Sequence, residues 1–473
     1  MAQALSDKKN FAKKSYLIDN DSINLNTYVE TYDNRFVVHR RNSQKMALSY
    51  ISNLLRCEKN HTNMERMVEH DIDTEIEYHQ YYHFLSESKW DYHSVNECTM
   101  LQTSEIMEQI KLQNNTPTGL IIDESATLKK GSESVGVARQ YAGVAGKVDN
   151  CQVAVYCSLT NNENATLIDT ALFLPQKWID DKNRCDKAHI PEAKLVFKTK
   201  PQLALEMIKR QVALGVKFDW IGGDGLYGHN SELTRGLDKE GLFYVLDIHK
   251  DETVFLEEPA FLIPERSKKK GRAPTKIIPN VEAIRVDKYC KNLKDIDFKL
   301  VTVRKTAKGW KHLQVHTVAV WHWDGVEEKA QTRTLIITKT TDNNPQIKYS
   351  FSNGKVDEYT EEKYAHFQSS RYWVERCFDD AKNETGLSGY QVRGWLAWHH
   401  HQALVMMASL YLMKIKLAEK PNYELMSVRD ARIMIIAHIY ADQETITLLH
   451  NQMIKRHKSR KKDIDRYYKN EDS

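Results

Sequence analysis

Several features are missing from this chain of 473 residues. Its seven cysteines include no pair at C-x-x-C spacing, which argues against a disulfide framework or zinc site and for a reducing compartment, the cytoplasm. No apolar run reaches membrane-spanning length, and the best candidate, ALVMMASLYLM (403–413), is better interpreted as a buried helix. The first fifteen residues carry charges with no apolar stretch behind them, so neither a signal peptide nor a membrane partner is expected.

The composition is that of an ordinary globular protein, with 41% hydrophobic, 28% charged and 10% aromatic residues. The length predicts two or three domains. The net charge of +4 is small but unevenly distributed, because the stretches 266–276 and 455–469 are strongly basic. Such runs are either solvated segments or phosphate-binding ones, which makes four residues of the first run candidate DNA contacts: Lys268, Lys269, Lys270 and Arg272.

The N-terminal part divides into an arm and a helical domain. Residues 1–41 are rich in Asn, Asp and Lys, which predicts an arm that is partly mobile. Residues 42–115 show helical periodicity, and Thr62 with Glu65 has the spacing of a capping box. A small all-helical domain of this kind either binds DNA or serves for packing or dimerisation.

Strands and helices alternate from residue 116 onward, which predicts an α/β fold. Apolar runs at 118–123, 151–157, 166–174, 218–224 and 241–248 are expected strands, with a helix at 201–215 and another near 230–240. The alternation of strands and helices stops at residues 250–345, whose pattern suggests a β-rich insertion. We therefore expect a core of residues 116–249 and 346–400, followed by a helical C-terminal region with a basic tail (401–473).

The segment RYWVERCFDDAK (371–382) places Arg371, Glu375 and Lys382 in one narrow helical stripe, since they are four and seven residues apart. A second stripe suits a packed core: Val374, Cys377 and Ala381. Taken alone, the charged stripe is most simply a solvated helix face.

Three acids stand at the edges of expected elements. Asp123 ends the first core strand, Asp224 ends a later one, and Glu375 lies on the helix after the insertion. The ends of neighbouring parallel strands form a natural ligand crevice. Three carboxylates there suit two Mg²⁺ ions, with Mn²⁺ as a substitute, and two such ions can promote phosphoryl transfer. The glycines of GGDGLYG (222–228) either allow a close backbone approach or only make a turn.

Four motifs in this order resemble bacterial insertion-sequence transposases of the DDE class, in the group with a Tyr–Arg–Glu–Lys signature. The signature spacing is met by Arg371, Glu375 and Lys382, and DGLYG supplies the second aspartate. Residues 123–155 resemble the first-aspartate region, and 386–401 resemble the stretch after the signature. The resemblance covers about residues 45–415. The family's tyrosine position is occupied by Gln368, which can donate a hydrogen bond to phosphate but cannot stack.

The resemblance implies a ribonuclease H-like core, a DNA-binding N-terminal domain, and a homodimer that acts on the inverted-repeat ends of double-stranded DNA by cut-and-paste. Arg371 and Lys382 would then bind phosphates beside the scissile bond. Further DNA contacts are expected from Lys129, Lys130 and Arg139, although these could be solvated loop charges. Relatives in this group can form a hairpin on the excised end and hold a flipped base against an aromatic ring. The candidates are Trp321, Trp323, Tyr349 and Phe351, although aromatic residues in a β-rich segment are mostly core residues.

Two alternatives stay open at this point: a nuclease on the same core that does not transpose, and a domesticated protein that binds DNA without cutting it. The helical domain and the long insertion favour a transposase over a simple nuclease. The three acids and both signature cations argue against a protein that only binds. The consecutive histidines 399–401 are expected to be packing or surface groups, because helical metal pairs need a spacing of three or four residues.

Overall fold

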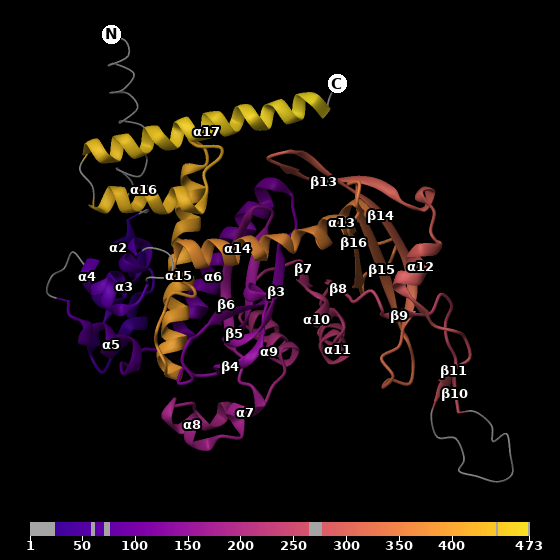
Figure 1. Ribbon diagram of the computed structural model, residues 1–473, viewed down its shortest axis with the longest axis horizontal. Helices are drawn as coiled ribbons and strands as arrows, with labels where there is room; N and C mark the ends of the chain where they lie inside the picture. Colours follow the sequence, from indigo (N-terminus) through magenta and orange to yellow (C-terminus); the bar gives the residue numbers. More distant parts are fainter. Residues whose placement is uncertain (1–23, 58–61, 71–75, 264–276, 441–442, 472–473) are drawn as a thin grey trace. The chain divides into compact units, whose positions relative to one another are not determined.

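The computed structural model describes residues 24–57, 62–70, 76–263, 277–440 and 443–471 (Figure 1). The chain forms two compact units. The first is Met1–Thr118, Asp123–Lys217 and Trp373–Asn470, and the second consists mainly of Gly119–Ile122 and Phe218–Tyr372. Strand β3 (Gly119–Leu128) belongs to both, its first four residues to the second unit and the rest to the first.

The first unit is organised around one long buried helix, α15 (Trp395–Glu419), which packs against helices of the N-terminal part and against β6 (Figure 1). The N-terminal helices are α2 (Leu25–Glu30), α3 (Gln44–Arg56), α4 (Met64–His70), α5 (Tyr78–Ser86) and α6 (Tyr92–Asn114). Nearly every α15 side chain is buried, as the apolar run 403–413 predicts. In the described part of the chain, no helix is both long and apolar enough to span a membrane.

The predicted arm is folded where the structure describes it. From residue 24 on it forms α2, a 3₁₀ turn (Asp33–Phe36) and a short hairpin of β1 (Val37–Val38) and β2 (Arg41–Asn42). The Tyr28 hydroxyl donates to the Met407 carbonyl oxygen at 2.9 Å, which ties α2 to α15. Tyr32, fully buried, bonds to Thr99 of α6.

The consecutive histidines pack inside this unit, as expected. His400 stacks on Trp90 with ring centroids 3.7 Å apart, and its two ring nitrogens lie 2.8 Å and 3.0 Å from the carbonyl oxygens of Leu85 and Trp90. His401 contacts the Tyr50 hydroxyl at 2.8 Å. Each of these bonds joins α15 to the N-terminal helices, so the helical domain shares its core with the rest of the unit.

The first unit also holds the predicted hairpin, in which β5 (Lys147–Asn161) pairs antiparallel with β6 (Asn164–Leu172). The remaining elements are β4 (Ala138–Ala142), α7 (Gln176–Ile179), α8 (Lys182–Lys187), α9 (Lys200–Ala213), α14 (Tyr372–Glu384), α16 (Val428–Tyr440) and α17 (Gln443–Glu471). Val374, Cys377 and Ala381 of α14 are buried, which confirms the apolar stripe. All seven cysteines are free and buried.

The second unit is a mixed sheet in the order β13–β14–β15–β16–β8–β7–β3. Strands β3, β7 (Trp220–Gly223) and β8 (Tyr244–Asp247) run parallel, and β13 (Lys299–Thr306), β14 (Gly309–His322), β15 (Gln331–Thr340) and β16 (Ile347–Ser352) extend the sheet antiparallel. The helices are α10 (Gly225–Gly228), α11 (Ser231–Lys239), α12 (Val286–Asn292) and α13 (Glu361–Ser370), and short pairs are formed by β9 (Thr253–Val254) with β12 (Ile284–Arg285) and β10 (Phe261–Leu262) with β11 (Ile278–Pro279).

Two details differ from the sequence-based expectations. Strand β3 continues five residues past Asp123, so Asp123 lies inside a strand rather than at its end. Thr62 does not cap α4. The Asn63 side chain accepts from the Arg66 backbone N–H instead. The strands of the predicted insertion, β13 to β15, join the sheet through β16, which pairs with β8, and the insertion boundaries stay a prediction.

Candidate metal centre

The geometry of the site begins with the pairing of β3 and β7. Ile122 lies opposite Gly223 in the parallel register, and each is followed directly by an aspartate, Asp123 and Asp224. Asp224 leaves the sheet at this point as the N-cap of α10, with its Oδ1 accepting from the Leu226 backbone N–H at 3.0 Å. Backbone pairing thus brings together two acids that are 101 residues apart in the sequence.

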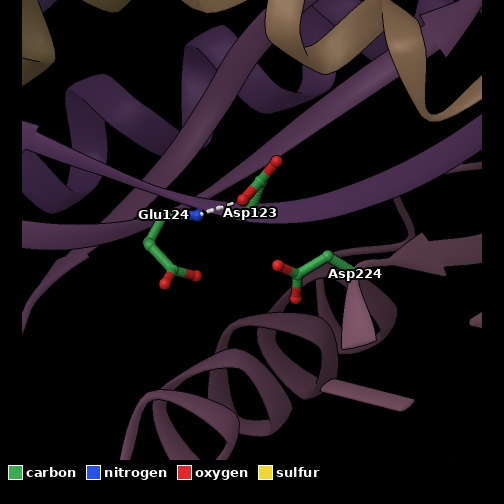
Figure 2. A group of neighbouring side chains, drawn as sticks. All are labelled: Asp123, Glu124 and Asp224. Carbon is green, nitrogen blue, oxygen red and sulfur yellow. Dashed lines mark hydrogen bonds between the residues drawn. The ribbon is translucent and has the colours of Figure 1, made fainter. Parts of the chain in front are cut away.

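A third carboxylate joins these two. Ligand oxygens of Asp123, Glu124 and Asp224 all lie within 4.8 Å of one another, and all three residues are half-buried (Figure 2). Figure 2 shows the Glu124 and Asp224 carboxylates turned toward each other, while Asp123 accepts from the Glu124 backbone N–H at 2.8 Å. Oxygen-only donors at this spacing fit a hard divalent cation such as Mg²⁺.

Glu124 was not foreseen from the sequence. Neighbouring residues of a strand normally point to opposite faces, so the pair Asp–Glu gave no reason to expect two ligands. Its Oε1 accepts from the Lys200 ammonium at 2.8 Å, and both side chains are mostly buried. Lys200 therefore offsets one of the three negative charges.

Glu375 does not belong to this group of carboxylates among the described residues. It is an exposed residue in the first turn of α14. The structure therefore brings together two of the three predicted acids, Asp123 and Asp224, and leaves the role of Glu375 a prediction.

The signature cations have defined surroundings. The Nε of Arg371 lies 3.1 Å from the Oδ2 of Asp247, and both side chains are mostly buried. Asp247 ends β8, and it accepts from Ser350 at 2.7 Å as well. Lys382, half-buried on α14, lies 5.6 Å from the ring centre of Phe378. Phosphate binding by Arg371 and Lys382 stays a prediction.

Gln368 lies in the interior rather than on a DNA-facing surface. It is only 3% exposed, and its amide nitrogen donates to the Ser350 hydroxyl at 2.6 Å while its oxygen accepts from Thr338. These bonds link Gln368 through Ser350 to Asp247. A contact between Gln368 and phosphate would require this network to open.

The remaining predicted DNA contacts differ in exposure. Lys129 donates to the Tyr390 carbonyl oxygen at 2.8 Å, and burial lowers its pKa to about 8. Lys130, in the loop between β3 and β4, and Arg139, on β4, are both exposed. Four predicted contacts lie outside the described residues: Lys268, Lys269, Lys270 and Arg272. Among the aromatic candidates for base stacking, Tyr349 and Phe351 belong to a buried core, while Trp321 and Trp323 are half-buried.

A basic groove of about 920 Å³ lies within the second unit, next to Asp247. Its cationic lining comes from four lysines: Lys250, Lys291, Lys339 and Lys348. Asp251 and Asp287 are the acids among its lining apart from Asp247. Leu246 of β8 pairs with Gly223 of the adjacent parallel strand β7. The residues that follow them, Asp247 and Asp224, therefore lie at the same level of the two strands. The groove thus begins one strand away from a carboxylate of the site, and its four lysines exceed its three aspartates by one charge.

Comparison with known families decides the classification. A family model described as DDE superfamily endonuclease matches residues 36–310, more than half of the chain. The chain belongs to the DDE superfamily endonucleases. The matched residues include Asp123 and Asp224 and end before Glu375.

Two further similarities are more distant. A probable transposase for insertion sequence element IS701 from Microchaete diplosiphon is 25% identical over 317 residues, which cover 66% of this chain and 68% of that protein. The solved piggyBac transposase synaptic complex with hairpin DNA aligns over 98% of this chain and 80% of that one, with 9% identity. Its TM-score of 0.37 is too low to support conclusions about this DDE endonuclease.

Proposed function

We propose that this DDE endonuclease is the transposase of an insertion sequence, which cuts DNA at inverted-repeat ends and joins the cut ends to a target. The observation that carries the proposal is the placement of Asp123 on β3 and of Asp224 directly after the adjacent parallel strand β7, with their carboxylates in one group. The family match and the similarity to a probable insertion-sequence transposase support this reaction class.

The donor set suits the metal ions that this chemistry needs. Asp123 and Asp224 would hold Mg²⁺, with Mn²⁺ as a substitute, and the exposed Glu375 would complete the set once DNA is bound. Two bound ions would supply activation of the attacking oxygen and stabilisation of the leaving one. Glu124, which is neutralised by Lys200, would help to position the metal rather than serve as the third acid.

The chain's own cations would position the DNA. The lysine groove beside Asp247 would bind the phosphate backbone, and Arg371 would hold a phosphate near the cut. Lys382 would act in the same way, from the same stripe of helix as Glu375. We further propose a ribonuclease H-like core, membership of the Tyr–Arg–Glu–Lys group, and a homodimer on DNA.

A donor-plasmid assay tests the proposal. The element's own flanking sequence, including its imperfect inverted repeats, is placed around a marker, and the full chain is supplied with Mg²⁺. We expect excision of the marker and its insertion into a second plasmid. Cleavage without joining would instead indicate a nuclease that does not transpose. Retarded but uncut DNA would indicate a protein that only binds, and either result would refute the proposed function.

A further inference from the structure

A second large cleft, of about 940 Å³, lies wholly within the first unit. One wall is formed by α5. The other is formed by the segment 390–397, which follows α14 and includes the first residues of α15. The volume is at the upper end of the range of about 300–1,000 Å³ for ligand pockets. It therefore has room for a segment of polymer rather than only a small metabolite.

The α5 wall presents two aromatic faces to solvent. Tyr78 and Tyr82 are one helical turn apart, so their rings lie on the same side of α5. Each is 45% exposed, whereas Tyr81 and Phe84 of the same helix are buried in the core. Both tyrosines line the cleft and are nearly half exposed, so their rings offer surface on which flat groups can stack.

The opposite wall is held in place by backbone contacts. The Arg393 carbonyl oxygen accepts from the Val135 N–H at 2.8 Å, and the Trp395 N–H donates to the Ala188 carbonyl oxygen at 2.9 Å. Lys129 donates to the Tyr390 carbonyl oxygen from behind. The wall thus has a defined shape before any ligand arrives.

Glycine at position 389 is required by this arrangement. A Cβ there would come within 1.9 Å of the Thr62 hydroxyl oxygen, so the N-terminal helical part and the 390–397 segment approach closely. This approach fixes the end of the cleft nearest to α4.

The charged lining favours an anionic ligand. Three exposed cations from separate segments of the chain line the cleft: Lys89, Lys187 and Arg393. The acidic residues of the lining are Glu65 and Glu87. Aromatic faces combined with cations are the features by which proteins bind unpaired nucleic acid strands. Duplex DNA hides its base faces by stacking, so only an unpaired strand can use both tyrosine rings.

We propose that this cleft binds unpaired nucleotides of a DNA strand, with bases stacked on Tyr78 and Tyr82 and phosphates near Lys89, Lys187 and Arg393. The proposal rests on the proposed function, because strand cleavage is what would supply an unpaired end. It assigns the cleft a task separate from the chemistry at Asp123 and Asp224, namely holding a strand before or after it is cut.

The test is fluorescence anisotropy of the full chain without divalent metal, so that no probe is cut. Three probes are compared: an oligothymidine of about twelve nucleotides, an end duplex, and the same duplex with an unpaired tail. The variants are the double substitutions Tyr78→Ala/Tyr82→Ala and Tyr78→Phe/Tyr82→Phe. The matched control is Tyr141→Ala, since Tyr141 is 62% exposed on β4, away from the cleft lining.

We expect the alanine pair to weaken binding of the single strand and of the tail about tenfold or more, with little effect on the blunt duplex. The phenylalanine pair and Tyr141→Ala should bind as the wild type does, because stacking needs only the ring. If the alanine pair melts at a lower temperature than the wild type, Lys187→Gln with Arg393→Gln replaces it, with the same loss expected.

Failure of this inference is distinct from failure of the proposed function. A chain that binds duplex ends but gains nothing from a tail, or an alanine pair that binds single strands normally, would overturn the inference alone. A chain that binds none of the three probes would overturn both.

Discussion

Arg371 is paired with Asp247 at 3.1 Å, with side chains 17% and 16% exposed. The residue expected to hold a phosphate is therefore paired with a carboxylate. Asp247→Asn should weaken that pairing and strengthen binding of end DNA. Arg371→Ala should weaken binding and flatten the dependence of affinity on salt by about one counterion. The measurement is end-DNA affinity over a salt series.

Stability gives the same pair a second test. Arg371→Ala leaves Asp247 mostly buried without its cation, which should cost about 1–3 kcal/mol of unfolding free energy. Arg376→Ala is the matched control, because Arg376 is 49% exposed and pairs with Asp380 within one helix turn. That substitution should cost only tenths of a kcal/mol. Equal losses in denaturant melts would show that the Arg371 pair has no special role.

Gly228 should resist substitution. A Cβ at this position would lie 2.0 Å from the Asp247 carbonyl oxygen, a backbone atom that cannot move without disturbing β8. Gly228→Ala should destabilise the chain by about 3 kcal/mol or more. Gly143→Ala is the control, since nothing lies within 4 Å of its added Cβ, and it should change stability by less than about 0.5 kcal/mol. Matching thermal melts of the two variants would contradict this assignment.

Buried histidines should make the chain sensitive to acid. Burial lowers the pKa of His399 to about 3, of His400 to about 4 and of His401 to about 3, against an ordinary value of 6.5. Below pH 6.5 the unfolded chain binds protons that the folded one does not. The free energy of unfolding therefore falls as the pH is lowered, down to about pH 4 for His400 and about pH 3 for His399 and His401. Each histidine contributes up to about 1.4 kcal/mol per pH unit.

Urea melts at pH 7, 6 and 5 measure this slope. His399→Gln should flatten it by about 1.4 kcal/mol per pH unit. His79→Gln, at a side chain that is 73% exposed, should leave it unchanged. An unaltered slope in His399→Gln would mean that this histidine is already protonated in the folded chain.

Removal of residues 1–115 should unfold the first unit rather than only cost DNA recognition. The deletion removes the Leu85 and Trp90 carbonyl partners of His400 and the Tyr50 partner of His401, and it exposes α15. We expect aggregation and a lost cooperative melt. A truncated chain that melts cooperatively would show that the helical part is an independent domain.

The sequence predicted those helices and strands that are determined by the pattern of their own residues. The apolar runs before Asp123 and Asp224 predicted two buried strands. These strands pair in parallel, which explains why the two aspartates lie close together. The extension of β3 could not be foreseen, because ESATL is not an apolar run and becomes a strand through its neighbours in the sheet. Periodicity also could not show that Gln368 is buried, because its hydrogen-bond partners Thr338 and Ser350 lie 30 and 18 residues before it in the sequence.

The third acid calls for a direct comparison. Among the described residues, Glu124 lies in the carboxylate group beside Lys200, whereas Glu375 lies outside that group. We predict that Glu375→Gln abolishes cleavage of end DNA, and that Glu124→Gln only weakens the response to Mg²⁺. Cleavage rates over a Mg²⁺ series measure both. Loss of cleavage in Glu124→Gln with normal rates in Glu375→Gln would reverse the two roles.

The central claim is that Asp123 and Asp224 form the metal centre of a DNA-cutting enzyme. It is tested most directly by the cleavage rate of end DNA with Mg²⁺ for Asp123→Asn and Asp224→Asn, beside calorimetry of Mg²⁺ binding and the affinity for uncut DNA. We expect each variant to lose cleavage by about a thousandfold or more and to bind Mg²⁺ more weakly, while its affinity for DNA changes little. Cleavage at close to the wild-type rate by either variant would contradict it.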